Sequence, residues 1–167
     1  MGSQSFKVVG AEFGLKYNFS LGSVAAMLGY GMGSLNDDSV SVSDMKVQIQ
    51  KISLNYTMDN LFDEPYVAPF AQVGIHRFDW VERGVVGGAE QEESTVTGMT
   101  YHFKGGLSFQ LNWIERSIDP NSGLQNTYLD VFYSYYAKPS TVAEADGSEG
   151  DPNLSSAEVG VGLKMEF

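Results

Sequence analysis

A two-residue alternation of apolar and polar residues constrains the fold of this chain more than any other feature. It is clearest in the last eleven residues, Ala157 to Phe167, where apolar residues alternate with glycine, lysine or glutamate. Successive side chains of a β-strand point to opposite faces, so this stretch predicts a strand with one apolar face and one face of glycine and charge. The same alternation returns along the chain, and no stretch has the spacing of a helix. The sequence therefore predicts an all-β fold.

The alternation marks seven strands joined by turns, which predicts an antiparallel up-and-down meander. Short turns are expected at Ser20–Ser23 and Asp59–Glu64, and long acidic loops at Asn36–Asp44, Glu82–Ser94 and Lys138–Asn153. The predicted strands span approximately residues 6–19, 24–33, 45–58, 66–80, 99–113, 127–137 and 157–167.

Two positions disturb the alternation and predict local irregularities. The apolar phase of the third strand changes at Gln50–Lys51, so a β-bulge is expected there. Pro69 lies inside the fourth strand and has no N–H to donate, so a missing hydrogen bond or a bulge is expected at this residue.

The end of the chain carries a further pattern. The last strand ends on an aromatic residue, Phe167, with Met165 on the same face and Gly162 five residues before the end. This arrangement resembles the last strand of the outer-membrane β-barrels of Gram-negative bacteria, although that family prefers a polar residue where Gly160 stands. The resemblance implies an antiparallel up-and-down transmembrane β-barrel of about eight strands in the bacterial outer membrane. It also implies contact with membrane lipid and recognition of Gly162, Met165 and Phe167 by the outer-membrane assembly machinery.

The count of seven strands conflicts with a closed barrel of this kind, because such barrels have an even number of strands. The first and last of seven antiparallel strands run parallel to each other, and two unpaired strand edges in lipid are costly. Three explanations remain open: a native strand missing at the N-terminal side, two strands interpreted as one, or a homo-oligomer that pairs its edge strands.

Composition narrows the class of protein. A chain of 167 residues forms one domain, assigned to residues 5–167, and residues 1–4 form a tail in which Met1-Gly2-Ser3 resembles an expression scar. The sequence has no cysteine for disulfides or thiolate metal sites, and no 18-residue apolar run for a transmembrane helix. A net charge of −11 argues against a nucleic-acid partner. The mean hydropathy of −0.16 suits a soluble protein and a barrel equally, because a barrel carries its apolar residues only at alternate positions.

The apolar face is predicted to contact lipid, while Gly14, Gly29, Gly106 and Gly162 face inward. Ten side chains are expected to be exposed on it: Val9, Phe13, Leu15, Leu28, Val73, Phe103, Leu107, Val131, Val161 and Leu163. Aromatic girdles mark the two interfaces of such barrels. We assign Tyr17, Phe19, Tyr56, Trp113 and Phe167 to the periplasmic girdle and Tyr30, Tyr101 and Tyr135 to the outer girdle.

The opposite face predicts an interior of mixed charge. Its charged groups are expected to pair with one another and to fill a narrow lumen, and an ion path is the alternative. The predicted interior residues are Glu12, Lys16, Lys46, Lys51, His76, His102, Lys104, Asp130, Glu158, Lys164 and Glu166.

The inner faces of the second, fourth and sixth strands are mostly uncharged. They either pack against the charged strands or form an apolar cavity for a lipid or an acyl chain. Their residues are Met27 with three glycines, then Tyr66, Ala68 and Phe70, and finally Tyr128, Phe132 and Tyr136.

The two histidines of the chain are predicted to face each other. A symmetric hairpin of the fourth and fifth strands, centred near Ala89, places His76 directly opposite His102, Ile75 opposite Phe103 and Gly74 opposite Lys104. Such a pair suits a proton-sensitive contact better than a zinc site, which needs a third ligand. The alternative is two unrelated histidines of the interior.

No sequence motif indicates catalysis, a cofactor or a metal site. The acidic segment from Asp146 to Asp151 lacks the spacing of a calcium-binding EF-hand and is expected to be a solvated loop. The sequence favours a non-enzymatic outer-membrane protein of the structural or adhesin-like kind, with acidic outer loops. The alternatives are a porin-like oligomer, a barrel that holds lipid or another hydrophobic ligand, and a soluble binding barrel of the lipocalin type.

Overall fold

A computed structural model describes residues 7–36, 44–59, 66–86, 89–111, 125–138 and 156–167, and these contain strands and no helix. No helix able to cross a membrane is therefore present among them. The predicted loops Asn36–Asp44 and Lys138–Asn153 and the predicted girdle residue Trp113 lie largely or wholly outside the described residues. The strands are β1 (Lys7–Phe19), β2 (Gly22–Asn36), β3 (Asp44–Thr57), β4 (Val67–Val86), β5 (Ala89–Val96), β6 (Thr100–Gln110), β7 (Asn126–Tyr136) and β8 (Ser156–Glu166).

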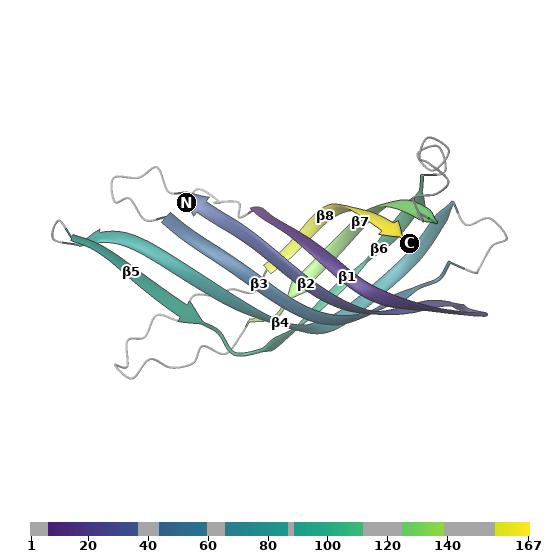
Figure 1. Cartoon of the computed structure of the whole chain (residues 1–167), viewed down its shortest axis with the longest axis horizontal. Coiled ribbons are helices and arrows are strands. Elements are labelled where there is room, and N and C mark those ends of the chain that lie inside the picture. The colour runs from purple at the N-terminus through teal and green to yellow at the C-terminus, as the bar shows by residue number, and fades with distance from the viewer. Residues whose placement is uncertain (1–6, 37–43, 60–65, 87–88, 112–124, 139–155) are drawn as a thin grey trace.

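Seven of these strands form one up-and-down path, so the predicted antiparallel meander is confirmed. Their order is β1-β2-β3-β4-β6-β7-β8, and β5 pairs with β4 away from this path. The sheet curves into a trough that remains open between β1 and β8 (Figure 1). The described chain is thus a half-barrel and not the closed barrel of eight strands that was expected.

The segment Glu82–Ser94, predicted as a loop, instead extends a hairpin. The last residues of β4 pair with β5 from Asp79 opposite Val96 to Val86 opposite Ala89. The early part of β4 pairs with β6. The length of β4, 20 residues, is what allows it to pair with both strands in turn. Glycine and glutamate in this segment suggested a loop, but pairing with β4 outweighs that local preference.

The predicted bulge at Gln50–Lys51 is wrong. The register of β3 runs without interruption against both neighbours, with Gln50 opposite Tyr30 on β2 and Arg77 on β4. Val47 and Ile49 therefore lie on the inner face, where they are buried with Phe78 and Tyr136 in an apolar cluster. Lys46 lies on the outer face for the same reason and is exposed, so its assignment to the interior is also wrong.

Pro69 lies where the pairing of β3 with β4 ends. The N–H of Met58 donates to the Pro69 carbonyl over 2.9 Å, and proline has no N–H to return the bond. The register of β4 with β6 continues through Pro69, which pairs with Leu107, so no bulge forms. The missing hydrogen bond thus falls at the margin of the ladder, where it costs little.

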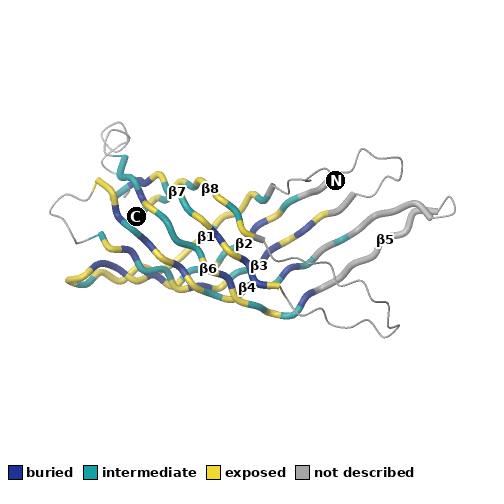
Figure 2. The backbone as a smooth tube through the Cα atoms, turned by 180° about the vertical axis from the view of Figure 1, so that it is seen from behind, coloured by how far each residue is buried: buried dark blue, intermediate teal, exposed yellow. Residues whose placement is uncertain are grey.

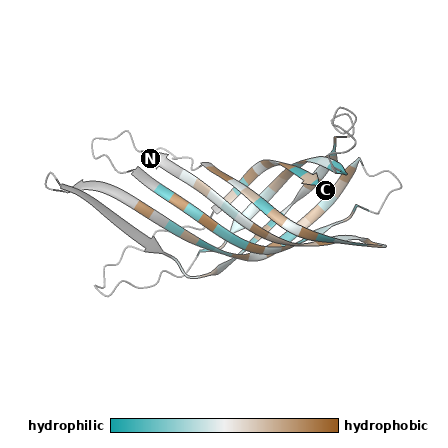
Figure 3. Cartoon of the chain, viewed as in Figure 1, coloured by the Kyte–Doolittle hydropathy of each residue, from teal (hydrophilic) through white to brown (hydrophobic). Residues whose placement is uncertain are grey.

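Most of the outer face of the half-barrel is apolar and exposed. All ten side chains predicted to lie on this face are exposed, which confirms that prediction, and Phe13 is 76% exposed. Exposed and buried residues alternate along the strands (Figure 2), as do hydrophobic and hydrophilic ones (Figure 3). The inward positions of Gly14 and Gly29 are confirmed, because a Cβ added there meets Met27 and the side chains of Glu12 and Lys51.

Candidate functional site: the polar interior

Glu12 is the central ionic group of the interior. Its two carboxylate oxygens accept hydrogen bonds from Lys51 Nζ at 2.7 Å and Lys104 Nζ at 3.0 Å, and Gln72 Nε2 donates over 3.3 Å. Gln72 also donates to Ser53 Oγ at 2.6 Å. These groups come from β1, β3, β4 and β6, so the contacts cross the concave face of the sheet and hold its curvature.

A second ionic group lies where β1, β3 and β8 end. Lys16 Nζ is 2.8 Å from Asp59 Oδ2 and 2.9 Å from Glu166 Oε1, and Lys164 Nζ is 3.4 Å from the same Glu166 oxygen. The Ser23 hydroxyl donates to Asp59 Oδ2 over 2.8 Å. Partial burial acts to raise the pKa of the Asp59 carboxyl, but the hydrogen bonds from Lys16 and Ser23 outweigh it and lower this pKa below its ordinary value.

The two histidines lie in an aromatic cluster of the interior. The ring centroids of His76 and His102 are 5.5 Å apart, and the His76 ring also lies 4.7 Å from Phe78 and 5.1 Å from Tyr136. Both imidazoles are buried, and within the described part of the chain none of their ring nitrogens has a hydrogen-bond partner.

The predicted register of this hairpin is wrong, although the two rings are in contact. His76 pairs with Thr100 and His102 pairs with Gly74, so the imidazoles meet diagonally and not directly across the strands. The centre of the hairpin lies before Ala89, because Val86 pairs with Ala89. A bulge then shifts β6 by one residue, because residues 97, 98 and 99 lie opposite only two residues of β4, 77 and 78. The other predicted pairs are displaced by the same two residues, so Phe103 lies opposite Val73 and Lys104 opposite Gln72.

Aromatic side chains and Met27 occupy much of the uncharged inner face. A Cβ added at Gly160 would meet the Phe132 ring, so this ring already fills the space beside β8. Lys104 Nζ lies 4.9 Å from the centroid of the same ring. Ala68, Phe70 and Tyr128 are buried, whereas Tyr66 is exposed and lies just outside β4. Most of the residues proposed to line an apolar cavity are therefore buried side chains, and the Phe132 ring lies beside a lysine ammonium group.

The remaining predicted residues lie on β7 and β8. Asp130 and Glu158 are half-buried on the inner face, opposite Gly162 and Ser134. Lys164 lies opposite Tyr128, with its Nζ 4.3 Å from that ring centroid. Met165 and Phe167 are exposed and share the outward parity, whereas Gly162 has the inward parity, so the residues proposed for recognition by the assembly machinery do not share one face.

Sequence reasoning left three polar members out of the interior network. Gln72 was expected to face inward, since it has the parity of His76, but it was not counted in the network because the inner face of its strand was classed as uncharged. Ser53 alternates in the same way with Lys51. Asp59 stands in a turn, where the alternation gives no information about direction.

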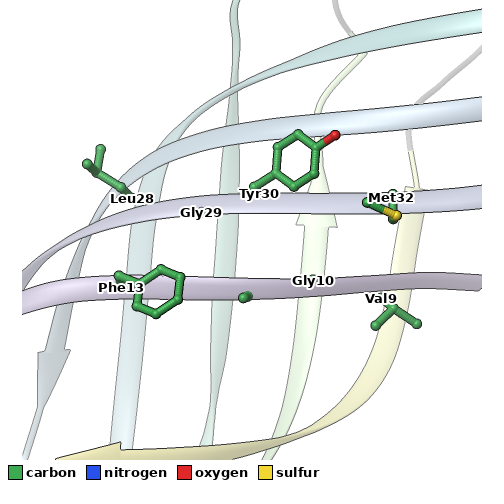
Figure 4. Close-up of a pocket in the computed structure, with 8 residues that line it drawn as sticks. Val9, Gly10, Phe13, Leu28, Gly29, Tyr30 and Met32 are labelled. Atoms are coloured by element: carbon green, nitrogen blue, oxygen red, sulfur yellow. The ribbon is translucent and has the colours of Figure 1, made fainter.

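The hollows described on this molecule lie on its outer face. One of about 470 Å³ is lined by apolar side chains of β1 and β2, among them Phe13, Leu28 and Tyr30 (Figure 4). The other, of about 270 Å³, lies between outward residues that include Leu54, Val73 and Phe103. Both are open and almost wholly apolar.

Among the described residues no group of three histidine, cysteine, aspartate or glutamate side chains is placed to hold a metal ion. Comparisons with protein-family models, with curated proteins and with solved structures give no match to this chain.

Proposed function

We propose that this protein is a non-enzymatic outer-membrane β-barrel protein of Gram-negative bacteria, structural or adhesin-like in its role. The observation that carries the proposal is an inversion of polarity. The convex face of the sheet exposes large apolar side chains on every strand of the path, and the concave face holds ion pairs. Monomeric proteins in water rarely expose a continuous apolar surface of this extent.

A soluble binding barrel of the lipocalin type is disfavoured by the same arrangement. Such a barrel places its apolar alternates inside, around the ligand, and its polar alternates in water. Here Phe13 and Leu15 point outward, while Glu12 and Lys51 form an ion pair inside. Lipid on the convex face supplies the apolar environment that these side chains lack in water.

A structural role is favoured over a pore or a lipid carrier because the concave face is cross-linked. Glu12 joins β1 to β3 and to β6, and Phe132 fills the space beside Gly160. A porin needs this space open for water, and a carrier needs it open for an acyl chain. Membrane lipid and the outer-membrane assembly machinery are the proposed partners.

The test is to refold the purified chain from urea, with and without detergent micelles or phosphatidylcholine vesicles. We expect β-sheet circular dichroism, a monodisperse species and a heat-dependent shift in gel mobility only when an amphiphile is present. A monodisperse folded species in plain buffer would contradict the membrane assignment. Stepwise conductance in planar bilayers would instead support the porin-like alternative.

A further inference from the structure

β1 and β8 form the two edges of the half-barrel and do not pair with each other. Within the described residues β1 pairs only with β2, and β8 pairs only with β7. No Cα atom of β1 lies within 8 Å of a Cα atom of β8. Opposed residues of paired antiparallel strands have Cα atoms about 4.5–5.5 Å apart. The edges are therefore separated by a seam.

One ion pair limits the width of this seam. Lys16 of β1 and Glu166 of β8 meet with 2.9 Å between Nζ and Oε1 on the inner side. Two strands that flank a third lie about 10 Å apart, because neighbouring strands are about 4.8 Å apart. Near the C-terminal ends of β1 and β8 the gap is therefore too wide for direct pairing but is bridged by one lysine and one glutamate, which corresponds to about the width of a single strand.

The directions of the two edges also suit a single strand. Each step along the path from β1 to β8 is antiparallel, so the two edge strands run in the same direction. One strand between them is antiparallel to both and hydrogen-bonds to both edges. β1 has 13 residues and β8 has 11, so a strand of about 11 residues covers the seam.

The two faces of the seam specify the side chains of this strand. Leu15 on β1 is 85% exposed and Val159 on β8 is 78% exposed, compared with 39% for Val131 inside the sheet. These outward side chains lack an apolar neighbour on the open side. Inside, Lys16 and Glu166 already occupy the space beneath the seam. Apolar residues therefore suit the outward positions, and glycine, alanine or serine suits the inward positions.

We propose that the seam binds one separate peptide strand of about 11 residues, antiparallel to β1 and β8, with alternating apolar and small residues. A second copy of the chain does not fit, because joining two half-barrels edge to edge requires a flatter sheet. The contacts of Glu12 with Lys51 and Lys104 oppose such flattening. The geometry of the seam is the same whether or not the outer face contacts lipid, so this proposal does not depend on the membrane assignment.

The chain itself supplies a probe of the required pattern. A synthetic peptide with the sequence of β2, Gly22–Asn36, has apolar residues at alternate positions and alanine, methionine or glycine between them. Within the chain, β2 pairs antiparallel with β1 and places Ala26 opposite Leu15, so a peptide that adopts the same register at the other edge of β1 brings residue 26 to Leu15. The peptide is made with Ala26→Cys, and single cysteines are introduced into the refolded chain, which has none of its own.

Leu15→Cys and Met165→Cys report binding at the two edges, because these outward residues directly precede the two bridging residues. Leu54→Cys is the matched control, since Leu54 is exposed on β3 but has strands on both sides. We expect disulfide capture of the peptide at both edges, at least tenfold above the control and saturating at one peptide per chain. A peptide with Leu28→Pro, which lacks one backbone donor, is expected to be captured at least fivefold less.

Three results would overturn the proposal. Equal capture at Leu54→Cys would mean that the peptide adsorbs to the apolar face. A disulfide formed within the double variant Leu15→Cys/Met165→Cys without peptide would mean that β1 and β8 pair directly. Disulfides between chains of the Leu15→Cys variant that exclude the peptide would assign the seam to a second copy. Each variant is first checked for the β-sheet circular dichroism of the parent chain.

Discussion

At the scale of single residues, Glu12 is the group on which the interior depends most. Its carboxylate lies between two ammonium groups, those of Lys51 and Lys104, at 2.7 Å and 3.0 Å. The alternation of the sequence was sufficient to assign these three charges to one face, because the direction of a strand side chain follows from parity alone. The partners of each charge could not be predicted, because they depend on how strongly the sheet curves.

Glu12→Gln is expected to lower the free energy of unfolding by about 3 kcal/mol, because it leaves two neighbouring lysines without their counter-charge. The measurement is urea-induced unfolding of the refolded chain, followed by tryptophan fluorescence. The double variant Glu12→Gln/Lys104→Met removes one of the uncompensated charges and is expected to recover part of the loss. Equal stability of Glu12→Gln and the parent chain would contradict the central role of this carboxylate.

Also at the scale of single residues, the Asp59 carboxyl is expected to make the stability of the fold depend on pH. Its pKa in the folded chain lies below the ordinary value of 3.8, so its contribution to stability is complete above that pH and is lost as the pH falls through the folded pKa. Asp59→Asn is therefore expected to be less stable than the parent at pH 7. The difference between the two should shrink progressively below pH 3.8, as measured by urea midpoints. A difference that does not change with pH would show that the ionised carboxylate is not involved.

At the scale of secondary-structure elements, the bulge between β5 and β6 offsets the pairing of β6 with β4 by one residue relative to the pairing of β5 with β4. Buried Thr97 holds it: the Thr97 N–H donates to the Phe78 carbonyl at 2.9 Å, and the Phe78 N–H donates to Thr97 Oγ1 at 3.0 Å. The sequence predicted β6 and the first part of β4, because alternation is a local signal, but it assigned most of β5 to a loop. It did not predict this bulge or the pairing of β5, since both depend on contacts between distant residues.

Thr97→Val keeps the shape of the side chain but removes its oxygen, so the buried Phe78 N–H loses its acceptor. The expected cost is about 1–3 kcal/mol. Faster amide hydrogen exchange is expected in the β4–β5 hairpin but not in β7 and β8. Thr97→Ser keeps the hydroxyl and is expected to restore slow exchange. If the valine and serine variants behave alike, the hydroxyl does not hold the bulge.

At the scale of the whole molecule, the proposed membrane location rests on the polarity of the two faces. The sequence predicted this polarity and the odd number of strands in the path. It did not predict the half-barrel with a seam, because closure depends on the total curvature of the sheet and no local pattern encodes that.

Val73→Arg places a charge on the outer face of β4, in the middle of the apolar surface. In lipid it is expected to cost about 2–4 kcal/mol, whereas on a water-facing sheet it would cost almost nothing. Leu21→Arg is the matched control, because Leu21 is similarly exposed but lies in the turn between β1 and β2, where the expected cost is below about 1 kcal/mol. Reversible unfolding in phospholipid vesicles measures both. Equal costs for the two variants would contradict a lipid-facing surface.

The hairpin of β4 and β5 leaves a second kind of free strand edge, that of β5. A free strand edge is a site where fibrils can begin to grow. Within the described chain β5 pairs with β4 alone, so the backbone groups of its other side can template the addition of further strands. Its eight residues include three glutamates, Glu90, Glu92 and Glu93. Like charges brought together by stacking copies of this edge repel one another, and natural proteins use charged edge strands against such stacking. The acidic composition that made this segment resemble a loop is thus expected to oppose amyloid-like association at the free edge of β5.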